Sequence, residues 1–216
     1  IFVSDSSFKK EEDAGHAMRG YLILRGDPEL LKKGVRMPVH IIDYGSKQQR
    51  HVVRATFSAE LYAAADTLDV GLLQTVTIEE ISRGKPMTMQ EAKELMETGP
   101  TAVKVCLCID AKSVYASVTA NTLKVPAESS TFLHIKWMRE LIERGVLHAI
   151  VWLDTRCMLA DGLTKGSVDR KDLHAGMDGS WEIVDCEVWR PTKRMHIVIG
   201  ETVVDEVSTA CMPRGW

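Results

Sequence analysis

Two apolar runs of the sequence each end in an aspartate. Asp5 follows residues 1–4 and Asp110 follows residues 103–109, and both runs have the composition of buried strands. An ionised carboxylate is costly to bury unless a positive group faces it, and a hard divalent cation is a natural partner for oxygen ligands. The pair therefore predicts either a metal site or two aspartates that merely end their strands, and further acidic residues must decide between the two.

Hydrophobic periodicity along the chain predicts an α/β fold. The expected strands span residues 1–5, 20–24, 38–44, 103–109 and 146–153, and the expected helices span residues 54–71, 89–97, 113–123 and 131–144. The first three strands follow one another directly, which favours an antiparallel meander. Strands and helices then alternate, so we expect a mixed five-stranded sheet with helices on its faces.

The length of 216 residues suits one domain with an appendage. We expect the domain to span residues 1–166, with residues 71–102 as an elaborated connection before its fourth strand. Residues 167–216 form an extension, in which the alternating runs 180–189 and 195–199 predict a β-hairpin. Strand character begins at the first residue, so we expect the chain to be part of a longer polypeptide.

The composition narrows the classes of partner. Hydrophobic residues make up 45% of the chain and charged residues 26%, and no apolar stretch approaches the roughly 20 residues of a membrane helix, so no membrane partner is expected. The formal net charge of −3 gives no overall basic surface, so a nucleic acid would have to be bound by a local basic patch. Five cysteines without a CxxC spacing indicate free thiols in a reducing compartment.

Two further acidic residues favour the metal site. Glu60 lies near the start of the expected helix 54–71, beside its apolar stripe, from where it can reach the end of a strand. Asp161 follows the fifth expected strand, where the chain returns across the sheet. Four carboxylates gathered from four elements would repel one another, and at least one would take up a proton, unless a cation lay between them.

The order of these carboxylates resembles the four-carboxylate site of the ribonuclease H fold. Local motifs are similar to those of the ribonuclease H domain of copia-type LTR retrotransposon polyproteins, over about residues 1–166. The matching stretches are Phe2-Val3-Ser4-Asp5, Ser46-Lys47-Gln48-Gln49, Ser58-Ala59-Glu60-Leu61-Tyr62, Ile109-Asp110-Ala111-Lys112-Ser113, His134-Ile135 and Leu159-Ala160-Asp161-Gly162-Leu163-Thr164-Lys165. One departure is Ala111, where the family has an asparagine.

The resemblance implies a metal-dependent endoribonuclease that cuts the RNA strand of RNA/DNA hybrids during reverse transcription. It implies two Mg²⁺ ions about 3.5–4 Å apart, with Mn²⁺ as a substitute. Asp5 then bridges both ions, and Glu60 and Asp110 hold the ion beside the scissile 3′ oxygen. Asp161 completes the ion that activates water. The implied partners are the hybrid and the upstream reverse transcriptase region of the same polyprotein, in cytoplasmic virus-like particles or the nucleus rather than outside the cell.

Five residues are candidates for binding the substrate. An enzyme that selects RNA must contact the 2′-hydroxyl, and Ser6, Gln48 and Ser113 are placed for that contact. Lys47 and Arg54 belong to a short basic run that can bind phosphates. Ordinary roles in turns, helix caps and solvated strand ends remain alternatives for all of them.

Two other functions stay open. The first is a catalytically silent ribonuclease H-like module used for binding or assembly. The change at Ala111, the long connection 71–102 and the appended hairpin motivate it. The second is an integrase or transposase core of the same fold. It is less favoured, because such sites usually end on a helical glutamate, whereas this chain has Asp161.

Overall fold

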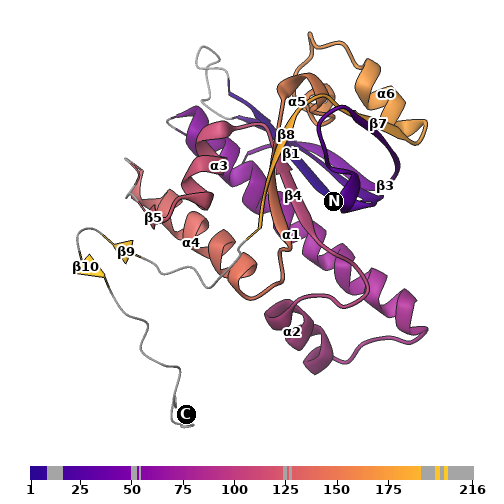
Figure 1. Ribbon diagram of the computed structural model, residues 1–216, viewed down its shortest axis with the longest axis vertical. Coiled ribbons are helices and arrows are strands. Elements are labelled where there is room, and N and C mark those ends of the chain that lie inside the picture. Colours follow the sequence, from indigo (N-terminus) through magenta and orange to yellow (C-terminus); the bar gives the residue numbers. More distant parts are fainter. Residues whose placement is uncertain are drawn as a thin grey trace.

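The computed structural model describes residues 1–8, 17–49, 53, 55–123, 126, 128–190, 198–199 and 202–203 (Figure 1). The strands of the main sheet are β1 (Phe2–Ser7), β2 (Met18–Gly26), β3 (Val35–Gln48), β4 (Cys106–Ile109), β6 (Ala149–Leu153), β7 (Ser180–Ile183) and β8 (Cys186–Trp189). The helices are α1 (Thr56–Arg83), α2 (Met89–Thr98), α3 (Lys112–Thr119), α4 (Ser129–Glu143), α5 (Asp161–Thr164) and α6 (Lys171–Met177). Single 3-10 turns are η1 (Pro28–Leu30) and η2 (Thr155–Cys157), and a small second sheet joins β5 (Thr122–Leu123), β9 (Val198–Ile199) and β10 (Thr202–Val203).

The main sheet has the strand order β7-β3-β2-β1-β4-β6-β8. Strand β2 is antiparallel to both of its neighbours, β1 and β3, whereas β4 runs parallel to β1 and β6 runs parallel to β4. The prediction of a mixed α/β fold whose first three strands are antiparallel is therefore confirmed. The sheet has seven strands rather than five, because β7 and β8 extend it at either edge.

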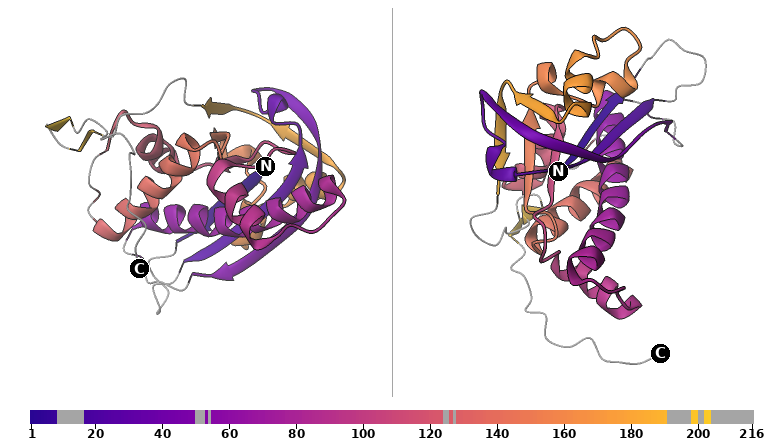
Figure 2. Two further views of the ribbon diagram at one scale, coloured as in Figure 1. Left: turned by 90° about the horizontal axis from the view of Figure 1, so that it is seen from below. Right: turned by 90° about the vertical axis from the view of Figure 1, so that its right-hand side faces the viewer.

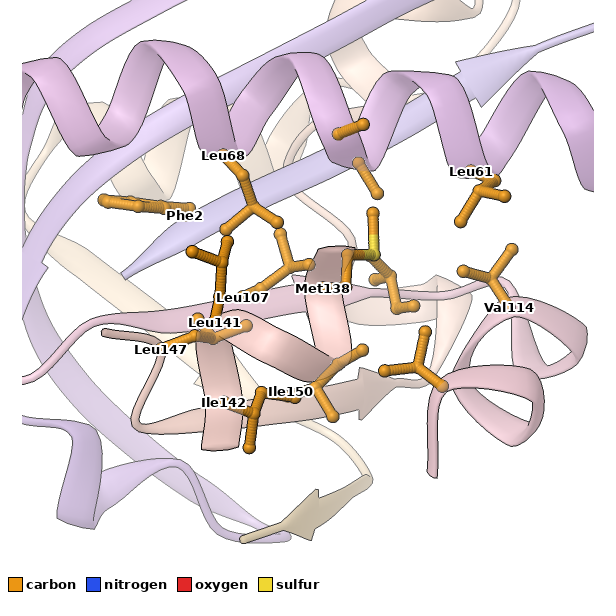
Figure 3. Close-up of a cluster of buried hydrophobic side chains, with 14 of the residues drawn as sticks. Phe2, Leu61, Leu68, Leu107, Val114, Met138, Leu141, Ile142, Leu147 and Ile150 are labelled. Atoms are coloured by element: carbon orange, nitrogen blue, oxygen red, sulfur yellow. The ribbon is translucent and has the colours of Figure 1, made fainter. Parts of the chain in front are cut away.

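The two faces of the sheet carry separate hydrophobic cores. Successive residues of a strand point to opposite faces, so Phe2 of β1 packs in the core beneath α1, α3 and α4, while Val3 packs in the core on the other face. Figure 3 shows the first core, in which Leu61 and Leu68 of α1 face the sheet and Met138 of α4 fills the space between them. Strand β4 is buried along its whole length, as expected for a central parallel strand covered on both faces.

Helix α1 extends well beyond the predicted end near residue 71. It runs for 28 residues and stops at Gly84, whose φ of 67° is the left-handed conformation that often terminates helices. Gly71 lies inside the helix because the ring of Phe2 packs against it: a Cβ added there would lie 2.4 Å from a ring carbon. The expected connection 71–102 therefore consists largely of the second half of α1 followed by α2.

The prediction of a hairpin between residues 180–189 and 195–199 is wrong in its pairing. The first run is broken into β7, which pairs with β3, and β8, which pairs with β6. Only two residues join these strands, although they lie at opposite ends of the strand order, so the sheet curls and its edges approach each other (Figure 2). Alternating polarity identifies the buried face of a strand but not its partner. Of the second run, residues 195–197 lie outside the described part of the chain.

Within the ranges given above, no helix combines the length and the apolar character that crossing a membrane requires.

Candidate metal centre

Three carboxylates from three elements meet at one end of the central strands. Ligand oxygens of Asp5, Glu60 and Asp110 all lie within 4.8 Å of one another. Parallel pairing of β1 with β4 aligns Ser4 with Ile109, so the two aspartates that follow these residues lie side by side on neighbouring chain segments. Helix α1 packs across β1 and supplies Glu60 from its second turn.

The backbone around each carboxylate is fixed by specific contacts. Asp5 lies within β1 rather than at its end and pairs with Gly20 of β2. A Cβ on Gly20 would lie 2.7 Å from the methyl carbon of Thr164, so glycine allows α5 to approach the sheet at this point. The backbone carbonyl of Asp110 accepts a hydrogen bond of 2.8 Å from the indole N–H of Trp152 on β6.

A buried glutamine holds the start of α1 against β1. Gln49 donates through Nε2 to the carbonyl oxygen of Ala59 at 2.6 Å and to the hydroxyl of Ser6 at 3.4 Å. The backbone N–H of Ser6 in turn donates to the carboxylate of Glu60. These contacts tie α1 to β1 beside the carboxylates and so determine where Glu60 lies.

Burial and, to a smaller extent, the charges of neighbouring carboxylates raise the pKa of all three carboxyl groups. Burial, with the nearby charges of Asp5 and Asp110, raises the pKa of Glu60 to about 9. For Asp5, burial and the charges of Asp161 and Asp110 raise the pKa to about 7, although hydrogen bonding from Thr164 lowers it. Burial raises the pKa of Asp110 to about 6. The three groups therefore resist simultaneous ionisation at neutral pH unless a cation compensates their charge.

The fourth predicted ligand, Asp161, is joined to this group through a lysine. Asp161 is buried at the first position of α5, and its Oδ1 lies 2.5 Å from Nζ of Lys165. The same ammonium lies 3.4 Å from Oδ1 of Asp5, and the hydroxyl of Thr164 donates to the other carboxylate oxygen of Asp5. Burial alone would lower the pKa of Lys165, but its hydrogen bond to Asp161 and the charges of the surrounding carboxylates raise it.

Thr164 and Lys165 are contacts of the site that the sequence interpretation missed. The spacing of Asp161 and Lys165, four residues apart, is the signal that could have found the ion pair, because such residues are neighbours on a helix. A position directly after α5 does not by itself show that the ammonium of Lys165 points toward the carboxylates rather than into solvent.

The predicted substrate contacts lie at different distances from the carboxylates. Ser6 is buried, with 3% of its surface exposed, so in this conformation it supports Glu60 rather than facing a substrate. Lys47 and Gln48 are exposed at the end of β3, where pairing places Lys47 opposite Arg19 and thus two strands from Ser6. Ser113 is exposed in the first turn of α3, close in sequence to Asp110. Arg54 lies outside the described residues.

The donor set fits a hard divalent cation. Three carboxylates supply only oxygen, which is the ligand type that Mg²⁺ and Ca²⁺ prefer. Mg²⁺ binds through a few carboxylates and keeps several waters, so three or four such groups are sufficient. The raised pKa values of the three groups also favour a cation site, because a bound cation would compensate the charge of the ionised carboxylates.

Comparison of the chain with protein-family models gives no match, and comparison with curated proteins gives none either. The assignment of a function therefore depends on the residues and their geometry.

Proposed function

We propose that the chain is a ribonuclease H-type enzyme, a metal-dependent endonuclease that hydrolyses the RNA strand of RNA/DNA hybrids. The observation that carries this proposal is the convergence of Asp5, Glu60 and Asp110 from β1, α1 and the end of β4. The five strands β3-β2-β1-β4-β6, with β7 and β8 set aside, would then correspond to a ribonuclease H-like sheet. The copia-type polyprotein resemblance of the motifs supports the same reading and adds a role in reverse transcription.

In this proposal the carboxylates bind the metal, and the neighbouring residues position them. Asp5, Glu60 and Asp110 would hold Mg²⁺, and Asp161 would add a ligand once its contact with Lys165 is released. When bound, divalent ions polarise the phosphodiester and lower the pKa of an attacking water. The buried Gln49 and the N–H of Ser6 would keep Glu60 in place while the phosphate is bound.

Selection of RNA would fall to exposed groups at the rim. Ser113 on α3 and Gln48 on β3 are both exposed, and a side chain that contacts the 2′-hydroxyl must be accessible. Lys47 would bind a phosphate on the side of the site formed by β2 and β3. Lys47 and Gln48 lie on β3, two strands from β1, and Ser113 lies on α3, three residues after Asp110, so a substrate that contacts all of them would extend across several strands.

The change at Ala111 leaves the proposed ligands intact. Ala111 occupies the N-cap position of α3 and makes no side-chain cap. An asparagine there would be a favourable helix cap, so its loss affects the start of α3 more directly than the carboxylate group. The departure from the copia-type motif is therefore compatible with an active enzyme.

The experiment is cleavage of an end-labelled RNA/DNA hybrid with and without Mg²⁺, with duplex RNA as the substrate control. We expect Mg²⁺-dependent cleavage of the hybrid alone. The variant Asp110→Asn should reduce cleavage to background, because it removes a charged ligand without changing the shape of the side chain. The matched control is Asp178→Asn, at an exposed position after α6, which should cleave like the wild type. Undiminished cleavage by Asp110→Asn would reject the proposal.

The second candidate, a catalytically silent binding module, is favoured by one observation. The ammonium of Lys165 already neutralises part of the charge of Asp5 and Asp161 without any divalent ion. A site that had lost its chemistry could be stabilised in this way. Absence of hybrid cleavage, together with absence of divalent-ion binding, would decide for the silent module.

A further inference from the structure

The position of Lys165 bears on how many metal ions the site can hold. Its ammonium lies 2.5 Å from Asp161 and 3.4 Å from Asp5. Its backbone N–H also donates to the carbonyl oxygen of Asp161 at 3.0 Å, which fixes the lysine at the end of α5. The charged end of the side chain is therefore held between the two carboxylates that a second metal ion would share.

A divalent ion and an ammonium compete for this place. The ammonium already lies against Oδ1 of both Asp5 and Asp161, the carboxylates that a second ion would share, and the like charges of the two cations repel each other. The competition is strengthened by burial, since both carboxylates are largely shielded from water, with 0% and 9% of their surfaces exposed.

The other half of the site has no such competitor among the described residues. Among these residues no ion pair joins Glu60 or Asp110 to a cation, and the charge of Lys165 acts on these two carboxyls only from a greater distance, where it lowers their pKa. Thr164 contacts Asp5 through a neutral hydroxyl. A first divalent ion held by Asp5, Glu60 and Asp110 would therefore be repelled less by the ammonium of Lys165 than a second ion beside Asp161.

We propose that the ammonium of Lys165 occupies the position of the second metal ion and so keeps that ion out of the free chain. The free chain then binds one divalent ion at Asp5, Glu60 and Asp110, and a second ion binds only when the ammonium leaves Asp161. Lys165 is in this sense a positioning residue, because it acts through Asp161 on metal occupancy. The inference rests on the proposed metal-dependent function and deepens it.

The test counts Mn²⁺ ions bound to the full chain, from the free-Mn²⁺ signal in electron paramagnetic resonance titrations without nucleic acid. Wild type is expected to bind one ion in the concentration range where Lys165→Met binds two, with the second site at least tenfold tighter in the variant. Lys165→Arg keeps the positive charge and should bind one ion. The matched control is Lys104→Met. Lys104 pairs with Glu29 and precedes β4, whereas Asp110 follows the other end of that strand, so this variant should bind one Mn²⁺ ion.

Circular dichroism establishes that each variant is folded, and Lys165→Gln repeats the test if the Met variant is not. The inference is overturned if wild type binds two ions of similar affinity, or if removal of the lysine charge leaves the count at one. Both of those results leave the metal-dependent function standing. Failure of wild type and of both neutral variants to bind any ion would count against the proposed function itself.

Discussion

Glu60 has the most strongly raised pKa of the three grouped carboxyls, and it makes the site sensitive to pH. In the folded, metal-free protein burial and the neighbouring aspartates raise its pKa from 4.5 to about 9. The folded state therefore keeps a proton that the unfolded chain releases as the pH rises. Stability from this proton is fully present below pH 4.5 and is lost progressively as the pH rises toward about 9.

We predict that the metal-free protein loses thermal stability between about pH 5 and pH 9, and that Glu60→Gln loses less. A difference of about 1 kcal/mol between the two proteins changes the melting temperature by about 2–4 °C in a chain of this size. The measurement is thermal unfolding in EDTA across this pH range, with the exposed Glu94→Gln on α2 as a control that should follow wild type. Parallel pH profiles for wild type and Glu60→Gln would contradict the prediction.

At the same scale, the sequence predicted the carboxylates better than their partners. Asp5, Glu60 and Asp110 were identifiable because apolar strands and a half-buried helix leave few ways to place a polar group at their ends. The ion pair of Lys165 was not, since the direction of a long side chain depends on the tertiary surroundings. Burial of Ser6 was missed for a similar reason, because Gln49 and α1 cover it only in the folded chain.

Helix α1 continues past the residue at which the sequence predicts its end. Glycine is unfavourable in a helix interior by about 1 kcal/mol relative to alanine, so Gly71 indicates a helix end when the sequence is considered alone. In the fold it gives room for the ring of Phe2, and the helix continues to Arg83. The second half is held by Glu79, which is buried and accepts hydrogen bonds from Thr101 and from the N–H of Ala102.

We predict that Gly71→Val destabilises the protein by roughly 1–3 kcal/mol, because the added atoms would overlap the buried ring of Phe2. Urea unfolding at equilibrium measures the change. Gly166→Val is the control: apart from its two chain neighbours, no heavy atom of the residues that the structure describes lies within 4 Å of a Cβ built there, so its stability should stay close to that of wild type. Equal stability of the two variants would show that the ring of Phe2 can move aside.

At the scale of the whole molecule, β7 and β8 belong to the main sheet, and β7 adds buried side chains to one of its two hydrophobic cores. Trp181 of β7 is 1% exposed, lies in the second core and donates through its indole N–H to the carbonyl oxygen of Cys157. Ile183 is buried in the same core. Order and alternation of strands were predictable from the sequence, whereas their partners were not, because the edges of β3 and β6 that accept them exist only once the sheet has formed.

We predict that a chain ending at residue 166 does not unfold cooperatively, while a chain ending at residue 190 does. The shorter chain loses Trp181 and Ile183, and truncation of one buried aromatic residue already costs about 3–5 kcal/mol. Typical domains have only about 5–15 kcal/mol of stability. Urea unfolding followed by circular dichroism, with dye binding as a probe of exposed apolar surface, compares the two chains. A cooperative transition of the shorter chain would contradict the prediction.

The short helix α5 has a consequence for the dynamics of the site. Asp5 lies in β1 and Asp110 directly follows β4, and central strands of this kind in most proteins open only with the whole molecule. Asp161 belongs to a helix of four residues, and Lys165 directly follows it. Short elements of this kind unfold locally at a smaller cost in free energy. A brief opening of α5 can therefore separate the ammonium from Asp161 while the ligands on β1 and β4 stay in place.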